Sequence, residues 1–146
     1  ILPFILYFLQ LQEFFRENAE SWIERFAYKE AGPQLLLQAF LQRVVNGGGR
    51  IYREYGLGRR RTDILIEWNG QSEKTSKYVI ELKILHKSLE STIEKGLKQT
   101  VAYMDRTGTN TGHLLVFDKN EDKRWEEKIF REEREYDNKQ IVIWGM

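Results

Sequence analysis

The sequence predicts an α/β protein in which a mixed β-sheet is flanked by helices. Segments with apolar residues at helical spacing alternate with short runs rich in β-branched and aromatic residues. Three such runs follow one another over short polar loops, as antiparallel neighbours do, and the next run returns only after a helix, as a parallel strand does. The 146 residues suffice for one domain with a hydrophobic core.

The composition is that of an ordinary globular protein, with 41% hydrophobic residues, 31% charged residues and a formal net charge of +1. Cysteine is absent, which excludes disulfides, zinc–thiolate sites and thiol catalysis. The two histidines, His86 and His113, are interpreted as structural. No run reaches the roughly 18 apolar residues that a membrane-spanning helix needs, so we expect a cytoplasmic protein without membrane contact.

The first part of the chain is predicted to be helical and apolar. From about Ile5 to Phe26 apolar residues recur at helical spacing, without the basic region or cleavage site of a signal sequence. Because the chain does not begin with Met, we interpret it as a piece of a longer protein. Residues 1–32 are predicted to be a helical extension that contacts an upstream domain or a second copy in a homodimer, and residues 33–146 the main domain.

The main domain is predicted to begin with a helix and to continue into strands. Pro33 suits the first turn of a helix over Gln34–Val45, which the run Asn46-Gly47-Gly48-Gly49 ends. The charged segment Trp125–Glu135 fits either a helix or an irregular excursion. The other predicted elements are, in order, strands Arg50–Glu54, Thr62–Trp68 and Tyr78–Leu85, helix Ser88–Met104, and strands His113–Asp118 and Gln140–Trp144.

Two charged residues interrupt a strand that otherwise has the composition of a buried one. Glu81 and Lys83 lie two positions apart and therefore on one face. Burying them is costly unless they are paired or bind a cation. Asp63, near the start of the preceding strand, can lie beside Glu81 across the hairpin. A hard divalent cation would relieve the repulsion between these carboxylates, and Lys83 beside it could orient an attacking water or stabilise charge on a phosphate oxygen.

A buried salt bridge without catalysis is the alternative interpretation of this group, with Lys83 paired to Glu81 or to Asp63. Glu54, on the first predicted strand, is a candidate third acid. An exposed or ion-paired glutamate is the alternative there.

A basic stretch precedes these acids. Six arginines lie between residues 43 and 61, against one acid, and they are Arg43, Arg50, Arg53, Arg59, Arg60 and Arg61. The last three follow a turn flanked by glycines and are candidates for binding nucleic-acid phosphates, because guanidinium groups match phosphate geometry. A solvated basic turn is the alternative.

Three short motifs follow one another along the predicted strands and the next helix. They are REYGLGRRRTDILI, which contains Asp63, VIELK, which contains Glu81 and Lys83, and QTVAY, which runs from Gln99 to Tyr103. In this order they resemble the motifs of the PD-(D/E)xK nuclease superfamily. Gln99 and Tyr103 lie four residues apart, hence on one helical face, and resemble the Q-x-x-x-Y pair of the RecB-like branch.

The resemblance implies a restriction-endonuclease-like core, α-β-β-β-α-β, here with an extra C-terminal strand. It also implies that the aspartate and the glutamate hold Mg²⁺ or Mn²⁺, that the lysine assists the attacking water, and that the Q-x-x-x-Y pair lies near the active site and the nucleic acid. The implied activity is hydrolysis of phosphodiester bonds in nucleic acid, with DNA as the expected substrate. Thr62 stands where the family has a proline, so the alternative is a catalytically silent module that binds nucleic acid or joins domains.

A second resemblance covers nearly the whole chain. The segments that carry it are QLLLQAFLQRVVNGGGRIYREYGLGRRRTDILIEW, KQTVAYMDRTGTNTGHLLVFDK and IVIWGM. They resemble the C-terminal region of AAA-type ATPase-like proteins that pair a P-loop domain with a PD-(D/E)xK-like domain. This implies an upstream P-loop ATPase domain in the full-length protein. No Walker motif occurs in the chain, so ATP binding is not assigned to it.

Overall fold

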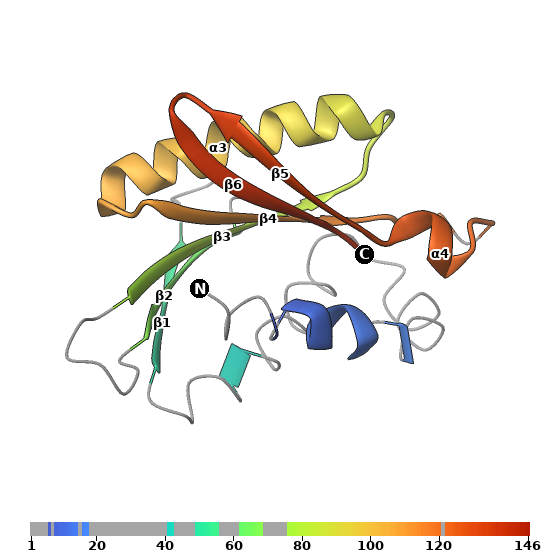
Figure 1. The fold of residues 1–146 in the computed structure, drawn as a ribbon, viewed down its shortest axis with the longest axis horizontal. Helices are drawn as coiled ribbons and strands as arrows, with labels where there is room; N and C mark the ends of the chain where they lie inside the picture. Colours follow the sequence, from blue (N-terminus) through green and yellow to red (C-terminus); the bar gives the residue numbers. More distant parts are fainter. Residues whose placement is uncertain are drawn as a thin grey trace.

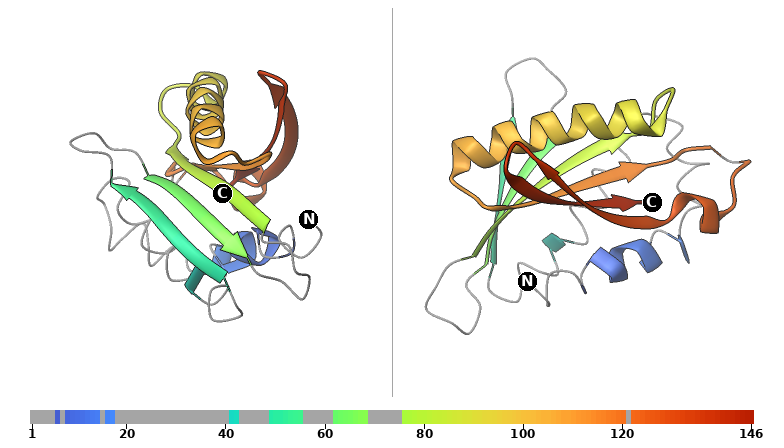
Figure 2. Two further views of the ribbon diagram at one scale, coloured as in Figure 1. Left: turned by 90° about the vertical axis from the view of Figure 1, so that its left-hand side faces the viewer. Right: turned by 45° about the horizontal axis from the view of Figure 1, so that its top comes forward.

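A six-stranded mixed sheet forms the centre of the molecule (Figure 1). The computed structural model describes residues 6, 8–14, 16–17, 41–42, 49–55, 62–68, 76–120 and 122–146, with the backbone alone at 51–55, 62–63 and 68. Helix α3 covers one face of the sheet, and the helical residues near the N-terminus lie on the other (Figure 2). No helix in this part of the chain is long and apolar enough to cross a membrane.

The strands are connected as the sequence predicted for the first four of them. The described elements are β1 (Gly49–Tyr55), β2 (Thr62–Trp68), β3 (Ser76–Ile84), α3 (Leu89–Thr107), β4 (Thr111–Phe117), α4 (Trp125–Lys128), β5 (Phe130–Tyr136) and β6 (Lys139–Gly145). Across the sheet the order is β1-β2-β3-β4-β6-β5. β1, β2 and β3 are antiparallel neighbours, β4 and β6 continue parallel to β3, and β5 is antiparallel to β6. The predicted mixed sheet flanked by helices is therefore confirmed.

Local sequence signals set the two ends of helix α3. The side chain of Ser88 accepts a hydrogen bond from the backbone N–H of Ser91 and caps the first turn. Gly108 ends the helix in the left-handed conformation, at φ 68°, where a glycine costs least. Glu90 in the first turn and Arg106 in the last both complement the helix dipole.

Each face of the sheet has its own hydrophobic core. On the α3 side, Ile93, Leu97, Val101, Tyr103 and Met104 of the helix pack on Val79, Leu114, Val116, Ile141 and Ile143. On the opposite side, Phe8, Leu11 and Leu41 join Ile64, Ile66, Tyr78, Ile80, Leu82, Leu115, Phe117, Trp144 and Met146. Successive residues of a strand alternate between the two cores, so the central strands β3 and β4 are buried on both faces.

The N-terminal helical residues are anchored to the sheet. Phe8 and Leu11 are buried in the sheet core, and Gln12 Nε2 donates a hydrogen bond to the backbone oxygen of Gly145 at 2.9 Å. Leu6 and Leu9 are exposed, at 56% and 42%. The contact with an upstream domain or a second copy stays a prediction, and the expected boundary at residue 32 lies outside the described residues. Of the predicted helix Gln34–Val45, only residues 41–42 are described, and they are helical.

Strand β5 was not predicted. The segment Trp125–Glu135, expected to be a helix or an irregular excursion, contains the single turn of α4 and then most of β5. Its Arg and Glu side chains alternate between half-buried and exposed positions, because β5 is the last strand of the sheet. A two-residue turn with positive φ at Asp137 (51°) and Asn138 (61°) joins it to β6. Charged residues on both faces removed the apolar alternation by which strands are recognised.

Candidate functional site

The register of β1, β2 and β3 aligns three acidic positions in one row across the sheet. Asp63 is the Cα partner of Glu81 on one side and of Glu54 on the other. Residues directly opposite each other in antiparallel strands share a face, with Cβ atoms about 5 Å apart. We call Glu54, Asp63 and Glu81 the acid row. The backbone brings these positions together, and of their side chains only that of Glu81 is among those described.

The acid row lies on the face that α3 covers. Leu65 and Val79, which pair with each other in the next row along the strands, both pack in the core beneath α3. Ile64, Ile66 and Ile80 pack in the opposite core. Alternation along each strand therefore assigns positions 63 and 81 to the α3 side.

Glu81 and Lys83 contact each other on that face. Glu81 is fully buried, whereas the side chain of Lys83 is 21% exposed. Lys83 Nζ lies 3.5 Å from Glu81 Oε1, which is the ion pair given above as the alternative to a metal site. The ion pair and a metal site are compatible with each other. A lysine this close to the carboxylate would also reach a water or phosphate oxygen bound to a metal ion that the carboxylate holds. The ammonium lies on the solvent side of the buried carboxylate.

Two glycines allow α3 to pack closely on β4. A Cβ at Gly96 would lie 2.6 Å from Leu114 Cδ1, and Leu114 is the β4 partner of Glu81. A Cβ at Gly112, one row further along, would lie 2.6 Å from Met104 Sδ. Gly96 therefore lies over β4 at the level of the acid row, and the following turn of α3 reaches the next row, where a Cβ at Gly112 would lie 2.9 Å from Thr100 Cγ2. Gly96 was not singled out from the sequence, although a glycine inside a helical pattern is a recognised sign of close packing.

Gln99 and Tyr103 belong to this stretch of α3. Tyr103 is 3% exposed and lies in the core that includes Leu65 of β2. Gln99, one turn earlier on the same helical face, is half-buried. Its Oε1 is buried and accepts no hydrogen bond within the described part of the chain. A buried amide oxygen in that state is costly and indicates a position suited to a bound partner.

The donor chemistry of the acid row fits a hard divalent cation. Three carboxylates in adjacent register supply the oxygen ligands that Mg²⁺ and Mn²⁺ prefer. Among the side chains that the structure describes, no group of three metal-ligating residues occurs. The side chains of Glu54 and Asp63 lie outside that set, as do Arg59, Arg60 and Arg61 entirely.

His113 occupies the opposite face of the sheet. Its Nδ1 accepts a hydrogen bond from Trp144 Nε1 at 3.2 Å, and its ring centroid lies 4.5 Å from that of Phe8. Burial first, and then the positive charge of Arg131, lower the pKa of His113 from 6.5 to about 3. The imidazole is therefore neutral at physiological pH.

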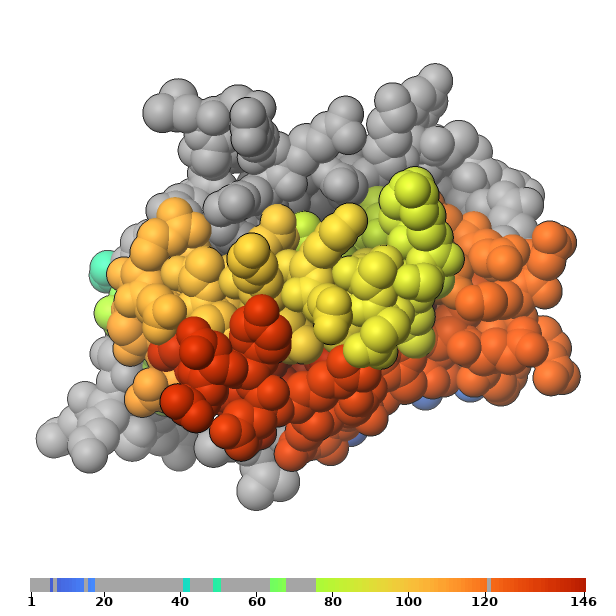
Figure 3. All heavy atoms as spheres, turned by 90° about the horizontal axis from the view of Figure 1, so that it is seen from above, coloured from blue at the N-terminus to red at the C-terminus, as the bar shows by residue number. Residues whose placement is uncertain are grey.

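The β5–β6 hairpin contacts the other flank of α3 (Figure 3). Arg134 forms ion pairs with Glu90 at the start of the helix, and its hydrogen bond lowers the pKa of Glu90. Lys139 Nζ lies 3.0 Å from Asp105 Oδ1 near the end of the helix. These pairs attach the hairpin to α3 at two points.

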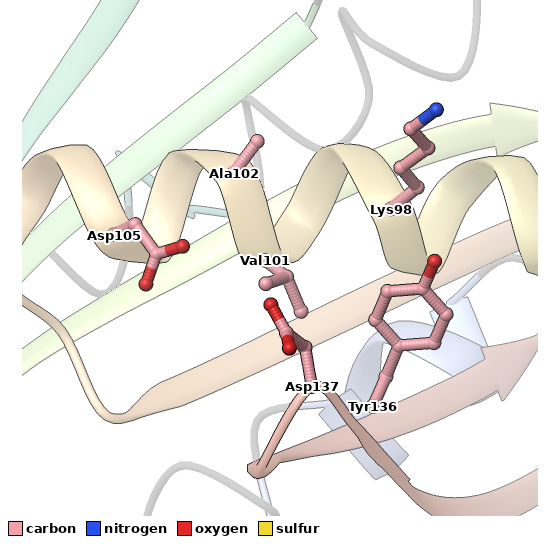
Figure 4. A pocket seen from close by; sticks show the side chains of 6 residues that line it. All are labelled: Lys98, Val101, Ala102, Asp105, Tyr136 and Asp137. Atoms are coloured by element: carbon pink, nitrogen blue, oxygen red, sulfur yellow. The ribbon is translucent and has the colours of Figure 1, made fainter.

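An open hollow of about 480 Å³ lies between the hairpin turn and α3. Asp137 and Tyr136 point toward the helix, whereas Lys98 extends away from the turn (Figure 4). Asp105, on its wall, is already paired with Lys139. The hollow lies on the opposite flank of α3 from Gln99. It is therefore separate from the acid row. Its lining residues are Lys98, Val101, Ala102, Asp105, Tyr136 and Asp137.

Comparisons with protein-family models, with curated proteins and with solved structures give no match.

Proposed function

We propose that this chain is a metal-dependent nuclease-like domain of the PD-(D/E)xK type, which hydrolyses phosphodiester bonds in nucleic acid, with DNA as the expected substrate. The observation that carries the proposal is the register of Glu54, Asp63 and Glu81, with Lys83 on the same face as Glu81. The order of three antiparallel strands, α3 and the parallel strand β4 supports the restriction-endonuclease-like core. The resemblance to AAA-type ATPase-like proteins implies a P-loop ATPase domain as a partner of this domain, and that partner is part of the proposal.

The acid row would hold the ion. Like charges in directly opposite strand positions destabilise a sheet, so three of them need a compensating cation. Asp63 and Glu81 are the proposed ligands of Mg²⁺ or Mn²⁺, with Glu54 as the third acid. The bound ion would supply Lewis acidity and lower the pKa of a coordinated water.

The surrounding polar groups would position the reactants. Lys83, adjacent to Glu81 and reaching solvent, would orient the attacking water and stabilise negative charge on a phosphate oxygen. Gln99, whose buried Oε1 has no hydrogen-bond partner in the described part of the chain, would accept a hydrogen bond from the bound water or the substrate. Tyr103, buried in the core beneath α3, would hold the helix on the sheet and thereby fix the position of Gln99.

A binding module without catalysis is the second candidate. The Lys83–Glu81 ion pair favours it, because that pair already compensates part of the buried charge without a metal. Thr62, in place of the family's proline, points the same way. On this reading the chain would contact nucleic acid or join domains.

Cleavage and metal-dependent stability separate the two candidates. We would incubate the full chain with Mn²⁺ or Mg²⁺ and single-stranded, duplex and branched DNA, alongside Lys83→Ala and the matched control Lys98→Ala. We expect cleavage by the unmutated chain and by Lys98→Ala, and a loss of about 1000-fold in Lys83→Ala. We also expect either ion to raise the melting temperature, because it binds the folded state alone. DNA binding without cleavage and without a melting shift would establish the binding module instead.

A further inference from the structure

A second row of charged residues lies on the α3-side face of the same strands. Glu67 of β2 is the Cα partner of Arg50 on β1 and of Lys77 on β3. Lys77 Nζ lies 3.7 Å from Glu67 Oε1, and Arg50 is exposed. This row is four residues along the strands from the acid row, which corresponds to roughly 13 Å.

Helix α3 adds a third cation on that side. Arg106 is exposed, and its guanidinium carbon lies 5.3 Å from the centre of the Tyr103 ring. From Gly96 at Leu114 to Thr100 and Met104 at Gly112, α3 runs antiparallel to β3 and β4. Arg106 follows Met104 and therefore lies toward the end of β3 that contains Lys77. Stacking on a buried aromatic ring restricts the guanidinium and holds it beside the sheet.

We propose that Arg50, Lys77 and Arg106 form a basic rim that contacts the phosphate backbone of the nucleic acid beside the acid row. This inference rests on the proposed function, since it assigns a surface to the same substrate. Two cations, Arg50 and Lys77, flank one acid, Glu67, and Arg106 of α3 carries a third positive charge on the same side of the sheet. A polyanion lying along the strands would meet the cations of the rim while its scissile phosphate approached the metal ligands.

Local roles explain only part of this arrangement. The helix dipole favours a cation in the last turn of α3, and a cross-strand ion pair accounts for Lys77. Arg50 on β1 adds a second cation opposite Glu67, which is already paired with Lys77, so this row carries two cations for one acid. Guanidinium groups at two of the three positions suit phosphate oxygens.

Binding without metal tests the rim separately from catalysis. We would titrate the full chain with a short fluorescein-labelled DNA duplex, and with the single strand, in EDTA at several salt concentrations. Arg50→Ala and Arg106→Ala should each weaken binding roughly threefold to tenfold and reduce the salt slope by about one. Lys98→Ala, which removes an exposed cation from the other flank of α3, should leave both quantities unchanged.

Three results would overturn the rim. They are no binding by the unmutated chain, unchanged affinity in both arginine variants, and a loss in Lys98→Ala equal to that in Arg106→Ala. Melting temperatures within about 2 °C of the unmutated chain would show that the exposed substitutions leave the fold intact. Binding in EDTA that depends on the rim, without cleavage in Mn²⁺, would retain the rim and remove only the catalytic proposal.

Discussion

The two faces of the sheet differ in the ionisable groups that they hold. On the α3 side, Glu81 and Lys83 lie 3.5 Å apart, and the register sets Asp63 opposite Glu81 and Glu54 opposite Asp63. On the other side, His113 is held neutral among aromatic rings and accepts a hydrogen bond from Trp144. The same sheet thus has one face with a neutral buried imidazole and one face on which three acidic positions are in register.

This difference indicates where function lies. A fold gains stability by neutralising or pairing its buried ionisable groups, as the face with His113 does. Aligning acids in adjacent strands costs stability, so their placement needs another reason. Polar groups that destabilise the apo fold and converge in one place are typical of functional sites.

The largest expected effect is on the charged face. Glu81→Gln keeps the shape of the side chain but removes one metal ligand, so we expect cleavage in Mn²⁺ to fall by about 1000-fold or more. Its metal-free melting temperature should stay the same or rise, because repulsion within the acid row decreases. Glu90→Gln, an exposed glutamate on α3, is the control and should cleave normally. If Glu81→Gln cleaves at the normal rate, the proposed catalytic role of the α3-side face is wrong.

On the neutral face we expect an effect on stability and not on cleavage. Because the folded pKa of His113, about 3, lies below its ordinary 6.5, the unfolded chain binds the proton more tightly. The stability from this residue is fully present above about pH 6.5 and declines as the pH falls toward 3. Between pH 7 and pH 4 the free energy of unfolding should drop by roughly 2 to 3 kcal/mol from this group.

Denaturant unfolding at a series of pH values measures this decline. His113→Asn keeps an acceptor near the position of Nδ1 and should flatten the pH dependence by that amount. His86→Asn, which changes the exposed histidine, should leave the dependence as it is. Equal slopes in the unmutated chain and in His113→Asn would mean that His113 is not kept neutral by the fold.

The smallest effect concerns the ion pairs of the hairpin. Arg134→Ala removes the contacts with Glu90 and Glu132 and should lower the melting temperature by about 2 °C, with a smaller decrease at high salt. Arg16→Ala, which breaks an exposed pair with Glu126 at 3.8 Å, should have no measurable effect. Neither variant should change DNA cleavage. A cleavage defect in Arg134→Ala would connect the hairpin flank of α3 to the site.

Local pattern predicted most of the fold. The ends of α3 follow from Ser88 and Gly108, and the mixed sheet follows from three strands on short loops and a fourth after a helix. The prediction failed for β5, because its strand character depends on pairing with β6 and not on an apolar alternation of its own.

The candidate site divides in the same way. The sequence by itself determined that Glu81 and Lys83 share a face, because the side chains of a strand alternate strictly. Only the tertiary structure decided that Glu54 joins the row of Asp63, that Gly96 packs on β4 at the level of that row, and that Arg50 lies opposite Glu67. The physical reason is that register and helix level depend on contacts between residues far apart in the chain, which periodicity does not encode.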